Sequence, residues 1–123
     1  MGWGVEFTDQ FGEWWDALDE EAQISINAVV LVLERVGPAL TRPYADTVKG
    51  SRHPNMRELR IQHQGRPFRL LYAFDPRRTA IILVGGDKGG DDRWYGVYIP
   101  IADKLYDEHL QQIENEKHPK EVQ

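Results

Sequence analysis

Glu58, Arg60 and Arg69 are the residues whose types and spacing favour chemistry. In residues 56–62 and in residues 66–74 the side chains alternate between two faces, which is the pattern of a strand, and a Gln-Gly turn separates the two segments. A hairpin closed at that turn places Arg60 opposite Arg69, with Glu58 on the same solvent-facing surface. Guanidinium groups bind phosphate oxygens in pairs, so this surface predicts an anion site. The alternative is an exposed ion pair between Glu58 and an arginine.

Further basic and aromatic residues, before, within and after this hairpin, are candidates for RNA binding or catalysis. Lys88 lies in the glycine-rich segment 85–90, which lacks the spacing of a P-loop or of a dinucleotide-binding fingerprint. Trp94 and Tyr95 could stack on a base of single-stranded RNA, and core packing is the alternative for at least one of them. The remaining candidate RNA-binding residues are all basic, and they are Lys49, Arg52, Arg57, Arg66 and Arg93.

Two histidines are candidates for proton transfer. His53 lies in the predicted loop before the hairpin, and His63 lies next to its turn. Either could act as an acid or a base near neutral pH, although a lone loop histidine is more often a bystander. His109 and His118 are expected at the surface of a C-terminal helical region. No histidine–carboxylate spacing matches a metal site, so no metal and no other cofactor is predicted.

The charge of the chain is segregated along the sequence. The net charge is −5, but residues 1–40 hold eight acidic residues and one arginine, while residues 42–69 hold seven basic residues and two acidic ones. A basic segment inside an acidic chain indicates one face that binds an anion. The alternative is a set of solvated charges along strand edges.

Composition places the chain in the class of small globular proteins. Its 123 residues predict one domain over residues 1–116, followed by a polar tail at 117–123. The absence of cysteine excludes disulfides and fits a reducing cytoplasm. No apolar segment is long enough to span a bilayer and no export signal is visible, so a cytoplasmic protein without membrane contacts is expected.

The elements expected to position these residues form an α+β fold. A short strand at 5–7 precedes a helix capped by Thr8 and a longer helix capped by Asp19, and a Gly-Pro pair at 37–38 ends the second helix. Residues 39–55 are expected to form a loop.

Three strands and a helical region complete the predicted fold. The hairpin strands and a third apolar strand at 79–84 are joined by tight turns, which predicts an antiparallel meander. Residues from 91 to about 116 are mainly helical in pattern, with Pro100 interrupting or starting a helix. We expect the helices to pack on one face of the sheet and to leave the other face open.

This order of elements resembles the RelE/ParE superfamily of toxins from type II toxin–antitoxin systems. The sequences Met-Arg-Glu-Leu-Arg at 56–60 and Phe-Arg-Leu-Leu-Tyr at 68–72, with an apolar strand ending near Lys88, are similar to its HigB branch, which is related to phage-derived proteins. The resemblance covers about residues 3–110 and makes a single RelE/HigB-like toxin domain the expected fold.

What the resemblance implies is a ribosome-dependent mRNA endonuclease that inhibits translation. In such proteins the RNA 2′-hydroxyl attacks the neighbouring phosphate without a metal. By position, Arg69 and Lys88 would stabilise the developing charge, and Arg60 would position the RNA. The candidates for proton transfer are His53, His63 and Tyr95.

The implied partners are a helix-turn-helix antitoxin, the ribosome and mRNA, with operator DNA contacted only through the antitoxin. Two features depart from the family pattern: the acidic overall charge, and the Gly-Gly-Asp-Asp segment at 89–92, where relatives often carry lysine or threonine. Two alternatives stay open. One is a ParE-like inhibitor of DNA gyrase, and the other is a catalytically degenerate antitoxin-binding module.

Overall fold

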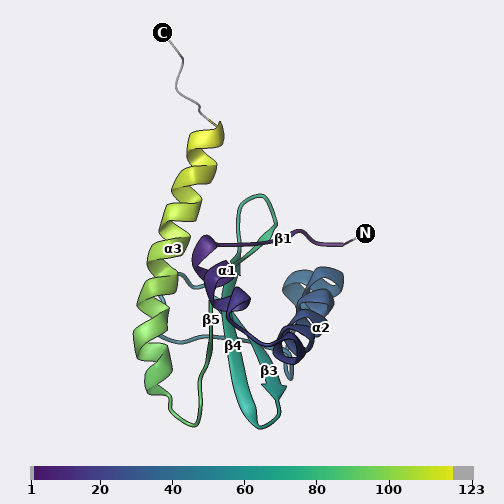
Figure 1. Cartoon of the computed structure of the whole chain (residues 1–123). Helices are drawn as coiled ribbons and strands as arrows, with labels where there is room; N and C mark the ends of the chain where they lie inside the picture. Colours follow the sequence, from purple (N-terminus) through teal and green to yellow (C-terminus); the bar gives the residue numbers. More distant parts are fainter. Residues whose placement is uncertain (1, 118–123) are drawn as a thin grey trace.

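The fold is a mixed five-stranded sheet between helices, and the computed structural model describes residues 2–117 (Figure 1). In chain order the elements are β1 (Val5–Phe7), α1 (Asp9–Asp16), α2 (Glu20–Val36), a 3₁₀ turn η1 (Gly37–Ala39), β2 (Ala45–Thr47), β3 (Arg57–His63), β4 (Arg66–Phe74), β5 (Ala80–Asp87) and α3 (Arg93–Lys117).

The strands lie in the order β1-β5-β4-β3-β2. The antiparallel meander β3–β4–β5 is confirmed, and in its register Arg60 lies directly opposite Arg69, as predicted. β1 adds a parallel strand beside β5, and β2 adds an antiparallel strand beside β3. The sheet is therefore mixed, and the hairpin that carries both arginines lies near its centre.

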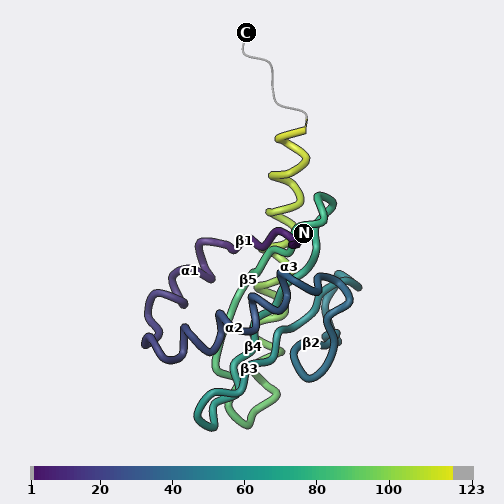
Figure 2. Tube along the Cα trace, turned by 90° about the vertical axis from the view of Figure 1, so that its right-hand side faces the viewer, coloured from purple at the N-terminus to yellow at the C-terminus, as the bar shows by residue number. Residues whose placement is uncertain are grey.

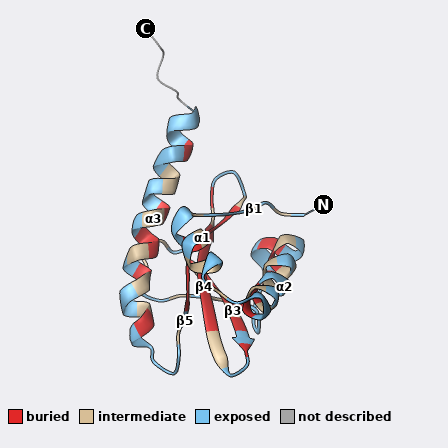
Figure 3. Cartoon of the chain, in the orientation of Figure 1, coloured by how far each residue is buried: buried red, intermediate tan, exposed pale blue. Residues whose placement is uncertain are grey.

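Helices cover both faces of the sheet. α1 and α2 pack on one face and α3 packs on the other, which Figure 2 shows from the α2 side. The prediction of an open second face is wrong, because the central strands are apolar on both sides: Leu70 and Tyr72 of β4 face α2, whereas Leu71 and Ala73 face α3. Buried residues accordingly run along the central strands (Figure 3). Burial on both faces is the pattern of a three-layer arrangement.

The predicted helix caps are confirmed. The Thr8 hydroxyl accepts a hydrogen bond from the Phe11 amide at 3.0 Å, and the Asp19 carboxylate accepts one from the Ala22 amide at 2.8 Å. Gly37 ends α2 with a φ of 68°, a left-handed value that favours glycine. These caps orient the helical hairpin against the sheet.

Two predicted segments differ in the structure. The expected loop at 39–55 contains β2, and β5 continues past Val84 to Asp87. Gly85 and Gly86 belong to this strand, and a Cβ at either position would lie 2.5 Å from an indole ring, that of Trp14 or that of Trp94 respectively. The first two glycines of the glycine-rich segment therefore permit close packing of tryptophan on the sheet.

α3 runs without interruption from Arg93 to Lys117, with Pro100 inside it. The surface position predicted for His109 is wrong, because its side chain forms a hydrogen bond with the buried carboxylate of Asp75. His118 and most of the predicted tail at 117–123 lie outside the described residues. No helix within residues 2–117 is long and apolar enough to cross a membrane.

Candidate functional site

Four side chains from three elements form one polar cluster, which we call the Glu58 cluster: Glu58 and Arg60 of β3, Arg69 of β4 and Tyr95 of α3. Arg60 Nη1 donates to Glu58 Oε2 at 2.8 Å, and the Tyr95 hydroxyl donates to Glu58 Oε1 at 2.5 Å. Arg69 Nε donates to the Tyr95 hydroxyl at 3.2 Å and lies 3.6 Å from Glu58 Oε1. The carboxylate therefore has a partner on each oxygen.

The Glu58 cluster is more buried than the sequence suggests. The side chains of Glu58 and Arg69 are 5% and 8% exposed, whereas that of Arg60 is 26% exposed. The prediction of a solvent-facing surface is wrong for the first two, because the start of α3 places Tyr95 over them. Arg60 remains the accessible edge of the cluster.

The charges of the Glu58 cluster do not balance. Two guanidinium groups surround one carboxylate, which leaves one positive charge in a largely desolvated position. A second Arg69 nitrogen, Nη1, donates to the Phe68 carbonyl at 3.0 Å. Within residues 2–117, Nη2 of Arg60 and Nη2 of Arg69 donate no hydrogen bond. An anion that reaches these nitrogens gains charge-assisted hydrogen bonds in a medium of low dielectric constant.

Two depressions adjoin the Glu58 cluster. The first has a volume of about 240 Å³ and is lined by Arg42, Pro43, Arg60, Ile61, Gln62 and Arg69. The second has a volume of about 330 Å³ and is lined by Thr47, Val48, Lys49, Glu58, Asp92 and Tyr95. The Glu58 cluster contributes Arg60 and Arg69 to the first depression and Glu58 and Tyr95 to the second, so it borders both.

Lys49 and Lys88 lie at the edge of the site. Lys49 lines the second depression, and Lys88 Nζ lies 3.3 Å from a carboxylate oxygen of Asp92, which lines the same depression. The Lys88 backbone amide donates to the Pro67 carbonyl at 2.9 Å, which ties the start of the β5–α3 connection to β4. The structure thus brings five of the predicted site residues to one region, and these are Lys49, Arg60, Arg69, Lys88 and Tyr95.

Three other predicted residues lie on the opposite face of the sheet, beside α2. His63 Nδ1 is 2.6 Å from the Ser25 hydroxyl oxygen. Arg57 Nη2 donates to the Leu40 carbonyl, and the Arg66 guanidinium lies 5.0 Å from the centre of the Phe68 ring. Alternation along β3 and β4 explains this placement, because neighbouring residues of a strand point to opposite faces.

The remaining predicted residues are also separate from the Glu58 cluster. His53 and Arg52 both bind Asp107, which lies twelve residues after Tyr95 and therefore about 18 Å further along α3. Arg93 pairs with Asp91 on the surface, and Trp94 packs in the core against Gly86.

Burial raises the pKa of Tyr95, and its hydrogen bond to Glu58 raises it further, while Arg69 opposes both effects. The phenol therefore keeps its proton at neutral pH, in contact with a carboxylate. Sequence reasoning did not select Arg42, Gln62 or Asp92 for the site. Arg42 precedes β2 and Asp92 lies in the β5–α3 connection, two segments for which the local sequence contained no strong signal. Gln62 lies on β3 two residues after Arg60, so the alternation of the strand was a usable signal for its position.

The chain is similar to known proteins over most of its length. A family model described as phage-derived protein Gp49-like matches residues 13–107. Among curated proteins of Mycobacterium tuberculosis, "Putative toxin HigB2" is 45% identical over 119 residues, which is 95% of this chain and 59% of that protein. "Putative toxin HigB3" is 47% identical over 96 residues, 77% of this chain and 82% of that protein. The chain thus spans about three fifths of the length of the first relative.

Solved structures share the fold at low sequence identity. The isolated Escherichia coli RelE toxin aligns with a TM-score of 0.54 and 16% identity, over 80% of this chain and 98% of that one. A chain of the archaeal RelE–RelB complex from Pyrococcus horikoshii aligns with a TM-score of 0.52 and 15% identity, over 72% of this chain and 98% of that one. The α+β fold predicted from the sequence is therefore confirmed.

Proposed function

The chain belongs to the family of phage-derived Gp49-like proteins, as a HigB-like member of the RelE superfamily, and from this premise we propose that it is the toxin of a type II toxin–antitoxin pair that cleaves mRNA on the ribosome. The observation that carries the proposal is the Glu58 cluster. It joins two arginines, a carboxylate and a protonated phenol between two depressions. These groups can supply a base, an acid and stabilisation of phosphoryl charge, the functions that metal-independent cleavage of RNA uses.

In the proposed reaction the 2′-oxygen of one nucleotide forms a bond to the adjacent phosphorus, and the bond from phosphorus to the 5′-oxygen breaks. Glu58 accepts the 2′-hydroxyl proton, and Tyr95 donates its proton to the departing 5′-oxygen. A 2′,3′-cyclic phosphate and a 5′-hydroxyl result. The 2.5 Å hydrogen bond between the two side chains then returns the proton from Glu58 to Tyr95.

In this proposal Arg69 stabilises the negative charge that develops on the phosphoryl oxygens, and Arg60 binds the scissile phosphate from the accessible edge. Lys49 binds the phosphate of a neighbouring nucleotide from the second depression, and Lys88 does so from beside Asp92 at its edge. His53 and His63 have no part in this mechanism, because Asp107 and Ser25 hold them away from the Glu58 cluster.

The proposed partners follow from family membership. A cytoplasmic antitoxin with a helix-turn-helix would neutralise the protein and contact operator DNA, and the likeness to the toxin fold found in a RelE–RelB complex supports such a pairing. The ribosome would present the mRNA. A ParE-like inhibitor of gyrase is the rival within the same fold, and clustered arginines around a carboxylate favour the nuclease.

The experiment is primer extension on an mRNA incubated with the protein, once with translating ribosomes and once without them. We expect new 3′ ends within codons that form in the presence of ribosomes. A parallel assay measures supercoiling by DNA gyrase, and we expect no inhibition. Intact mRNA together with inhibited supercoiling would replace the proposal with gyrase poisoning. Intact mRNA and active gyrase would leave an antitoxin-binding module without catalysis.

A further inference from the structure

A third hollow lies far from the Glu58 cluster, between β1 with the start of α1 and the C-terminal half of α3. Its volume is about 500 Å³. Ile113, which lines it, follows Tyr95 by eighteen residues and so lies about 27 Å further along α3. In Figure 1 the last turns of α3 extend past β1, which is one of the two edge strands of the sheet. We call this hollow the β1–α3 groove.

The β1–α3 groove has an apolar floor and an acidic rim. Phe7, Ile81, Leu105 and Ile113 supply apolar surface, and the Phe7 side chain is exposed although it lies beside Phe11. The acidic residues of the rim are Glu6, Asp9, Glu108 and Glu116.

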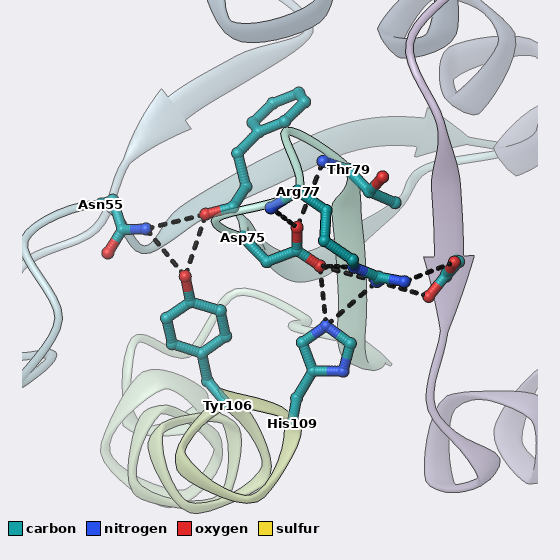
Figure 4. A network of polar contacts seen from close by, with 8 residues as sticks. Asn55, Asp75, Arg77, Thr79, Tyr106 and His109 are labelled. Carbon is teal, nitrogen blue, oxygen red and sulfur yellow. Dashed lines mark hydrogen bonds and ion pairs between the residues drawn. The ribbon is translucent and has the colours of Figure 1, made fainter. Parts of the chain in front are cut away.

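The two basic groups that line the β1–α3 groove are already engaged (Figure 4). Arg77 Nη2 lies 2.8 Å from an oxygen of Glu6 and 2.7 Å from an oxygen of Asp75. His109 Nε2 lies 2.8 Å from the same Asp75 oxygen. These contacts join β1, the β4–β5 turn and α3, so they fix the two walls of the groove relative to each other.

The rim therefore carries uncompensated negative charge. Within residues 2–117, Asp9, Glu108 and Glu116 form no ion pair, and Glu6 shares Arg77 with Asp75. Such a rim repels a phosphate backbone and attracts ammonium and guanidinium groups. An exposed aromatic side chain between acidic groups is also a surface that contributes to protein–protein recognition.

We propose that the β1–α3 groove docks a cationic amphipathic helical segment of a partner protein. An aliphatic side chain of that segment packs on Phe7 and Ile113, and its basic residues reach Glu108 and Glu116. The docking goes beyond the proposed function, since it involves no RNA and none of the Glu58 cluster.

The test uses fluorescence anisotropy with the whole chain and a fluorescein-labelled helical peptide of lysine and leucine, about 14 residues or about four turns long. We expect binding of this peptide and no binding of its glutamate–leucine counterpart. In the double variant Glu108→Lys/Glu116→Lys the dissociation constant should rise by about tenfold or more, with a smaller rise in Glu108→Gln/Glu116→Gln.

The matched control is Asp16→Lys/Glu20→Lys, which makes the same change of net charge at exposed positions outside the groove. It should bind the peptide as the unaltered protein does. Amide shift mapping should place the peptide at Phe7 and Ile113. Equal weakening in both charge-reversed variants, or shifts centred on α2, would overturn the proposal whatever the outcome of the RNA assays.

Discussion

Glu58 is the residue on which the two arginines and the phenol converge, and it is nearly inaccessible. A buried carboxylate of this kind needs compensating partners, and here they are also the groups that would bind a phosphate. The same contacts hold Glu58 against both guanidinium groups that would bind the phosphate. We therefore expect a variant that lacks this carboxylate to lose cleavage of RNA while it keeps binding of RNA.

We predict that Glu58→Gln lowers the cleavage rate by about 10²–10⁴-fold, because the amide cannot accept the 2′-hydroxyl proton. Binding of a short RNA should become equal or tighter, since two arginines then lose their opposing charge. Single-turnover cleavage and filter binding measure the two quantities. Loss of RNA binding in parallel with loss of cleavage would argue that Glu58 acts only to hold the arginines in place.

The buried tyrosine hydroxyls predict that the protein becomes less stable at alkaline pH. Burial is the main cause that raises the pKa values of Tyr72, Tyr95 and Tyr106 above the ordinary 10.0. Above pH 10 the unfolded chain releases these protons while the folded chain retains them, so the free energy of unfolding falls as the pH rises. Urea titrations at pH 8, 9, 10 and 11 should give a midpoint that drops in the last steps. A midpoint that stays constant to pH 11 would contradict the buried placement of these hydroxyls.

At the scale of elements, α3 completes the site by laying its first turn over β4 and β5. The glycine at the contact permits this, because a Cβ on Gly86 would lie 2.5 Å from the Trp94 ring nitrogen. Trp94 and Tyr95 are neighbours whose rings are 5.3 Å apart, so displacement of one ring moves the other. The position of the Tyr95 phenol, the proposed proton donor, thus depends on a glycine of the sheet.

We predict that Gly86→Ala destabilises the protein by about 1–3 kcal/mol, as overpacking does elsewhere. It should also reduce cleavage by moving Tyr95. Gly90→Ala is the matched control, because nothing lies within 4 Å of its added Cβ. Thermal unfolding of both variants compares them directly. Equal melting temperatures for the two variants would show that the first turn of α3 adjusts without cost.

The sequence was informative where interactions are local. The two-residue turn set the register of the hairpin, so Arg60 opposite Arg69 could be predicted. The covering of this face by α3 depends on contacts between β4 and residues 20 to 40 positions later, which periodicity does not encode. The apolar residues Leu71 and Ala73 beside Arg69 were a usable signal of that second buried face. The histidine prediction failed for a different reason: alternation along β3, which is local, sends His63 toward α2 and away from Arg60.

At the scale of the whole molecule, the acidic surface and the basic surface lie at different ends of α3. The Glu58 cluster and its depressions have an excess of arginine and lysine, whereas the β1–α3 groove is rimmed by carboxylates. A chain with a net charge of −5 can therefore still present a cationic site. RNA would bind one end of α3, and a cationic protein segment would bind the other.

Neutralisation of phosphates by this site predicts a salt-dependent affinity for RNA. We expect Lys49→Ala to reduce the slope of log K against log salt by about 0.7, the value for one contact to a single strand. Lys104→Ala, at an exposed position of α3, should leave the slope unchanged. Fluorescence titrations at several salt concentrations give both slopes. An equal reduction in the two variants would indicate a general charge effect instead of a phosphate contact in the second depression.

The most direct test of the central claim compares two arginines of one strand that lie on opposite faces of the sheet. Arg69→Ala removes the guanidinium proposed to bind the phosphate, and Arg66→Ala removes a guanidinium that lies over the Phe68 ring beside α2. The measurement is the rate of cleavage of a ribosome-bound mRNA under single-turnover conditions, with folding checked by circular dichroism. We predict a loss of about 10²-fold or more for Arg69→Ala and a rate near that of the unaltered protein for Arg66→Ala. Cleavage that survives in folded Arg69→Ala, or is lost equally in both variants, would contradict the assignment of the Glu58 cluster as the active site.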